Sequence, residues 1–313
     1  MDGYSTSSKH ELFNYLNLAV LSCILFTFGC RGTDKKVKAE NADLTHWASV
    51  KAEPFQGSPQ FLMTGVELYS KNCACCHGED GDGKGPNAGK LANKPRSFAK
   101  GVFKFRTTSS EGFPSDLDFF RTITVGAPAY DKPSFAHLSE HDRWALVAYL
   151  KKLTSTAMQK SFETAWKKNE RTADPEKITK LVADRMKPGK AISIPQEPKG
   201  NLQASIQRGR RLFIKSDYAC ANCHGPMGKG DGPNSATMKD EWGLFIPPRD
   251  LTKGERKYGG KPEDTVRLIL IGIPGTPMPA NELAGTFSAG VQEIWDIARY
   301  VEHLSKAGAG KAE

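Results

Sequence analysis

Two short segments of the chain share one pattern: two cysteines three positions apart, followed at once by a histidine. The segments are residues 73–77 (CACCH) and 220–224 (CANCH). This C-x-x-C-H pattern is the attachment signal for a c-type haem. Cysteines at this spacing lie on one face of a helical turn, so both sulfurs can reach one porphyrin, and the adjacent histidine can ligate the iron. The sequence therefore predicts two covalently bound haem c groups.

The predicted attachment residues are Cys73, Cys76, Cys220 and Cys223, and the predicted proximal iron ligands are His77 and His224. A zinc site is the alternative, but zinc needs four ligands clustered in space. Each segment instead supplies its histidine directly after the second cysteine. Of the seven cysteines, Cys75 is left over and two lie near the N-terminus, so no disulfide framework is expected.

The N-terminal segment predicts export. Residues 12–29 are mostly apolar, about the length of a secretory signal or a marginal membrane span. The run ends at Gly29-Cys30, which resembles a bacterial lipobox and predicts a signal peptide with lipidation of Cys30. An uncleaved anchor and a simply cleaved signal peptide are the alternatives. All three place the globular part on the periplasmic side of a membrane, where haem is attached covalently.

The chain is basic, with a formal net charge of +9. A basic surface favours acidic docking surfaces on protein partners, or anionic lipid. No recognition motif for nucleic acid accompanies the charge, so we expect no nucleic-acid partner.

The second half of the chain repeats the first. The spacing Gly-x-x-x-aromatic precedes both motifs, a glycine-rich loop with a proline follows both, and an amphipathic helix closes both halves. We expect a signal or anchor at 1–30, a tether at 31–60, a first domain at 61–155, a linker at 156–200 and a second domain at 201–310. The first closing helix is expected at 139–153, and the linker is expected to be partly helical but interrupted at Pro175.

These motifs resemble the class I cytochrome c fold in its tandem dihaem form. The resemblance implies an all-α protein in which the first and last helices of each domain cross at Gly65 and Gly209. It also implies that the carbonyls of Pro86 and Pro233 accept the proximal histidine N–H groups. Two arginines, Arg96 and Arg249, are expected to hold haem propionates.

The sixth iron ligands are expected to differ between the two haems. Residues 272–279 resemble the family's methionine loop, which makes Met278 the sixth ligand of the second haem. Aligning residues 125–128 with 271–274 places Lys132 where Met278 stands, and no methionine occurs between residues 63 and 158. The first haem therefore has Lys132 as its sixth ligand, or His137 or His141, or an open position. A nitrogen ligand would give it the lower potential.

We expect an electron carrier that is not an enzyme, acting in a respiratory chain between periplasmic or membrane redox partners. The alternative is a haem enzyme, a peroxidase or sulfur-compound oxidoreductase that uses the unusual first haem. A ligand-binding redox sensor is a third possibility. Neither paired carboxylates nor a distal histidine at a convincing position supports catalysis.

Overall fold

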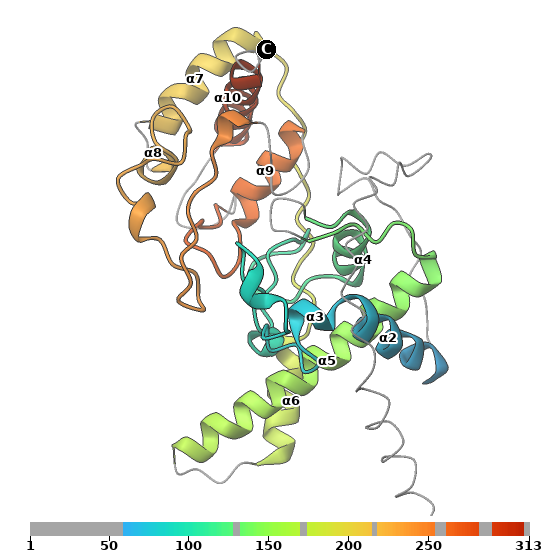
Figure 1. Ribbon diagram of the computed structural model, residues 1–313. Helices are drawn as coiled ribbons and strands as arrows, with labels where there is room; N and C mark the ends of the chain where they lie inside the picture. The colour runs from blue at the N-terminus through green and yellow to red at the C-terminus, as the bar shows by residue number, and fades with distance from the viewer. Residues whose placement is uncertain are drawn as a thin grey trace, which may run out of the picture. The chain divides into compact units, whose positions relative to one another are not determined.

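A computed structural model describes residues 59–127, 132–169, 174–214, 218–253, 261–281 and 290–309, all within one compact unit (Figure 1). The predicted signal segment, Cys30 and almost all of the tether lie outside these residues. The described ranges contain helices and isolated β-bridges but no strand, which confirms the all-α prediction. No helix among them has both the length and the apolar character needed to cross a membrane.

The first domain has four α-helices, α2 (Pro59–Asn72), α3 (Ala74–His77), α4 (Asp116–Val125) and α5 (Glu140–Lys168), with short 3₁₀ turns η3 (Ala88–Lys90) and η4 (Phe98–Lys100). The second domain repeats this order with α7 (Leu202–Ile214), α8 (Cys220–His224), α9 (Pro262–Ile271) and α10 (Val291–Ala309), and with η6 (Ser235–Thr237) and η7 (Leu251–Lys253).

Local capping explains where α4 and α5 begin. The Ser115 hydroxyl accepts a hydrogen bond from the Asp118 backbone N–H at 3.2 Å, and the Asp118 carboxylate accepts one from the Ser115 N–H at 3.0 Å. The Ser139 hydroxyl caps α5 by accepting a bond from the Asp142 N–H at 3.0 Å, without the reciprocal bond. These bonds satisfy donors that the first helical turn leaves unpaired.

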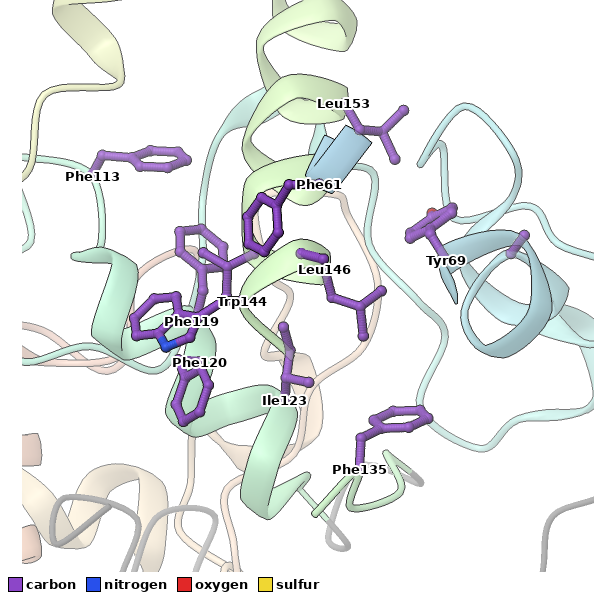
Figure 2. Packing of buried hydrophobic residues seen from close by; sticks show 13 residues of the cluster. Phe61, Tyr69, Phe113, Phe119, Phe120, Ile123, Phe135, Trp144, Leu146 and Leu153 are labelled. Carbon is purple, nitrogen blue, oxygen red and sulfur yellow. The ribbon is translucent and has the colours of Figure 1, made fainter. Parts of the chain in front are cut away.

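The core of the first domain is largely aromatic. Figure 2 shows Phe61, Phe120 and Trp144 among the buried residues that α2, α4 and α5 contribute to one cluster. Phe120 stacks on Trp144 with ring centroids 4.4 Å apart. Burial of large rings supplies most of the stabilisation for so small a domain.

Glycines set how closely the first and last helices of each domain approach, as the family resemblance implied. A Cβ at Gly65 would collide with the Ala145 carbonyl and lie 2.8 Å from the Tyr149 Cβ. A Cβ at Gly209 would collide with the Asp296 carbonyl and lie 2.9 Å from the Tyr300 Cβ. Both helix crossings therefore require a residue without a side chain.

Replacing Gly65 with alanine should lower the free energy of unfolding of the first domain by about 1–3 kcal/mol, because α2 and α5 must move apart. Gly89→Ala is the matched control, since a Cβ there meets nothing within 4 Å. Urea unfolding followed by circular dichroism measures both. Equal effects of the two substitutions would contradict the close crossing.

The linker differs from the expectation. The closing helix α5 continues past Leu153 to Lys168, and a further helix, α6 (Pro175–Arg185), packs against it. Pro175 begins α6 instead of breaking a helix, because the Asp174 carboxylate caps the turn by accepting hydrogen bonds from two backbone N–H groups at 3.0 and 3.2 Å. Buried Met158, Ile178 and Val182 form a small separate core between the two helices.

The extended segment after α6 forms hydrogen bonds with both domains. The backbone N–H of Phe113 donates to the Lys187 carbonyl at 2.8 Å, and that of Ser109 donates to the Lys190 carbonyl at 2.8 Å. Further along, the Trp295 indole N–H donates to the Pro195 carbonyl at 3.1 Å. The linker is therefore an ordered part of the structure and not a free tether between the domains.

Candidate functional site

Each C-x-x-C-H segment forms a short helix that ends at its histidine, α3 in the first domain and α8 in the second. The four motif cysteines, Cys73, Cys76, Cys220 and Cys223, are free and partly buried. This places two thiols one helical turn apart beside each histidine, which is the arrangement that covalent haem attachment requires.

Burial keeps these thiols neutral. It raises the pKa of Cys73 to about 11 and that of Cys220 to about 12, and it also raises the pKa values of Cys76 and Cys223. A zinc site needs thiolates, and no group of three or more histidine, cysteine or acidic side chains in the described ranges is placed to hold a metal ion. The thiols thus suit thioether bonds to a porphyrin better than metal coordination.

The two proximal histidines differ in the hydrogen bonding of their Nδ1 atoms. His224 Nδ1 lies 3.1 Å from the backbone oxygen of Arg249, whereas the family resemblance implied the carbonyl of Pro233. His77 Nδ1 is buried and has no hydrogen-bond partner among the described residues, Pro86 included. Burial, and secondarily the charge of Lys132, lower the pKa of His77 to about 4, so its imidazole is neutral and able to ligate iron.

A glycine at the same place in each domain lets the loop after the motif lie close to the backbone of a later proline. Gly83 and Gly230 have positive φ angles of 80° and 78°, a region that favours glycine. A Cβ on either would lie 2.6 Å from a proline carbonyl, that of Pro95 in the first domain and that of Pro248 in the second. The same close approach therefore occurs in both halves, and it positions the residue after each proline, Arg96 or Arg249.

The structure places these two arginines differently. The Arg96 guanidinium forms an ion pair at 2.5 Å with Asp240, whose side chain is fully buried. The backbone oxygen of Arg249 faces His224, as described above. Sequence reasoning missed Asp240, and also Lys104, whose pKa is lowered to about 8 by burial and by Arg96 despite the opposing effect of Asp240. The propionate role of both arginines stays a prediction.

The two distal loops are closed by matching backbone hydrogen bonds. The Ile273 N–H donates to the Met278 carbonyl at 3.2 Å, and the Ala127 N–H donates to the Lys132 carbonyl at 2.9 Å. Gly272 and Gly126 begin the two loops with positive φ angles of 69° and 72°. Lys132 thus occupies the backbone position in the first domain that Met278 occupies in the second.

Lys132 lies near the proximal residues. Its charge acts on both Cys73 and His77, and burial lowers its own pKa to about 8. The two histidines considered as alternatives lie elsewhere. His137 is exposed, and the His141 side chain is 54% exposed and packs edge-on against Phe61.

The geometry of each domain thus fits a c-type haem: paired neutral thiols beside a histidine and, in the first domain, a neutral imidazole whose buried nitrogen has no partner among the described residues. Comparison with known proteins agrees. The family model for cytochrome c matches residues 62–154 and 206–305. No curated protein is significantly similar to the chain.

Among solved structures, the chain is similar to one chain of the Kuenenia stuttgartiensis reducing HAO-like protein complex Kustc0457/Kustc0458. The identity is 29% and the TM-score 0.64, and the match covers 82% of this chain and 99% of the solved one. The family match supports haem-binding electron transfer, but the expectation that the chain is not an enzyme is contradicted by this likeness. The solved complex is named as a reducing, HAO-like one, which points to redox catalysis.

Proposed function

Because the chain belongs to the cytochrome c family, with two of its domains in tandem, we propose that it carries two haem c groups and exchanges electrons with a haem-containing redox complex of which it is a part. The family binds haem covalently, and haem supplies reversible one-electron exchange. The repetition of the motif helix, the glycine-guided loop and the distal loop in both halves is the observation that carries the proposal.

In each domain the chain's own residues have separate roles. Thioether bonds from the two motif cysteines would fix the porphyrin, and His77 or His224 would ligate its iron. In the second domain the Arg249 carbonyl lies 3.1 Å from His224 Nδ1 and would orient its ring, and Met278 is proposed to supply a thioether ligand. Arg249 is proposed to pair with a propionate.

The partner is proposed to be a redox protein with an acidic docking surface. Two observations support this: the net charge of +9 and the likeness to a chain solved within a protein complex. Opposite charges would increase the association rate and make it sensitive to salt. The globular part is proposed to lie on the periplasmic side, attached to a membrane through Cys30 or an uncleaved N-terminal segment.

The haem content tests this proposal. The exported protein should contain two irons per chain, measured by the pyridine haemochrome spectrum and by intact mass. The double substitution Cys220→Ala, Cys223→Ala should remove one haem mass and leave the first. A colourless protein, or one iron per chain in the unsubstituted protein, would refute the proposal.

A second candidate function is catalysis at the first haem. The observation that favours it is Lys132 in place of a methionine, together with the name of the solved complex. An exchangeable distal ligand would allow a small molecule to reach the iron. Carbon monoxide binding, and turnover of peroxide or hydroxylamine, would distinguish this role from electron transfer alone, which needs neither.

A further inference from the structure

We propose that the amine of Lys132, in its neutral form, is the sixth ligand of the iron in the first domain. This inference rests on the proposed function, because it requires a haem attached to residues 73–77. It concerns the identity of the distal ligand, which the family match leaves undetermined.

The backbone register is the first argument. Lys132 pairs with Ala127 through two backbone hydrogen bonds, the Ala127 N–H to the Lys132 carbonyl at 2.9 Å and the Lys132 N–H to the Ala127 carbonyl at 3.2 Å. In the second domain Met278 is held by the matching bond from Ile273. The two ends of the first distal loop are therefore paired at the same register as in the second, with lysine at the position of Met278.

The proximity of Lys132 to the proximal residues is the second argument. The lysine comes from the distal loop, yet it lies near enough for its charge to act on His77 and Cys73. A porphyrin attached through Cys73 and Cys76 would therefore have this lysine nearby.

The surroundings of the amine are the third argument. Lys132 is partly buried. Burial of a charged amine costs hydration free energy. Coordination avoids that cost, because the neutral amine gives its lone pair to the metal.

The competing ligands are less well placed. His137 is exposed, and His141 lies in the first turn of α5 with its ring against Phe61 and its side chain 54% exposed. Either histidine would have to leave its present packing to enter the site. Lys132 needs no rearrangement of its backbone.

Two properties should follow from amine ligation. A nitrogen donor is harder than a thioether and favours ferric iron, so the first haem should have a lower potential than the second. The lysine side chain is also longer than that of methionine and must fold to bind from the same register. We therefore expect this ligand to be displaced by external ligands more readily than Met278.

The test uses the full holoprotein after its two haems have been counted, so that loss of haem is not confused with the wrong ligand. Low-temperature EPR and near-infrared magnetic circular dichroism of the oxidised protein should show two low-spin haems, one with amine and one with thioether ligation. In Lys132→Ala, half of the iron should become high-spin and bind one equivalent of carbon monoxide rapidly. In Lys132→Met, both haems should show thioether ligation, and the lower potential should rise.

Lys152→Ala is the control, because this lysine is exposed on α5, and it should leave all spectra unchanged. A first haem that is high-spin before any substitution would overturn the proposal. So would a low-spin spectrum that survives Lys132→Ala and is lost in His137→Ala or His141→Ala. The Lys132→Met variant keeps the test decisive if the alanine variant folds poorly.

Discussion

Replacing Met278 with alanine is expected to lower the reduction potential of the second haem by about 0.1 V or more. A soft thioether stabilises ferrous iron, and axial ligands together set haem potentials over a range of about 0.8 V. For a one-electron couple, about 59 mV corresponds to a tenfold change in equilibrium constant, so this change would disfavour electron transfer from the first haem to the second by more than tenfold.

The matched control is Met227→Ala. Met227 follows the motif on the proximal side and is 53% exposed, so its loss should leave both potentials within experimental error. Spectroelectrochemical titration would resolve the two haems, and the thioether charge-transfer band should disappear only in Met278→Ala. An unchanged higher potential in that variant would show that Met278 is not the ligand.

Unequal reduction potentials would also set the direction of electron transfer between the two haems. If the first haem is the low-potential site, electrons that enter there pass within one molecule to the second domain. Met278→Ala and Lys132→Met would then both reduce the driving force, because the first lowers the reduction potential of the acceptor haem and the second raises that of the donor haem. Either variant should slow transfer between the haems while the overall fold is retained.

The parts of the structure that local patterns determine were predictable from the sequence. The C-x-x-C-H helices, the Ser115 cap and the crossing at Gly65 each depend on residues a few positions apart, or on one small residue that recurs in both halves. The alignment of Lys132 with Met278 rested on matching loop sequences, and the backbone bonds agree with it.

Long-range partners were not predictable in this way. The pairing of Arg96 with Asp240 joins residues far apart in the chain, and neither residue carries a local signal for it. The extension of α5 was missed because its second half is rich in charge and resembles a solvated linker. For the start of α6 a signal did exist: Asp174 before Pro175 indicates a helix start, since proline is well tolerated in the first turn.

The ion pair between the buried Asp296 and the partly exposed Arg208, at the crossing of α7 and α10, gives the second large prediction. Asp296 accepts hydrogen bonds from the Arg208 guanidinium at 2.7 and 2.9 Å, from Gln292 at 2.9 Å and from the Ser205 hydroxyl. Its side chain is 1% exposed, and the equivalent position in the first domain is Ala145. The second crossing is thus held by a polar network where the first is apolar.

Asp296→Asn should lower the free energy of unfolding of the second domain by about 2 kcal/mol, because the buried carboxylate loses its charge and its hydrogen-bond donors then face an amide. Glu302→Gln is the control on the same helix. Its pair with Lys306 is at the surface, so its loss should cost less than about 1 kcal/mol. Urea unfolding followed through the thioether band of the second haem reports this domain separately.

The effect of Asp296 should depend on pH. Burial raises its pKa, but the hydrogen bonds from Arg208, Ser205 and Gln292 outweigh burial, so the pKa in the folded protein is lowered. The stabilisation is then fully present above the ordinary aspartate pKa of about 4 and is lost as the pH falls through the lowered value. The stability difference between the unsubstituted protein and Asp296→Asn should therefore be largest near neutral pH and shrink in acid. A difference that stayed constant down to strongly acidic pH would mean that the charge of Asp296 does not stabilise the crossing.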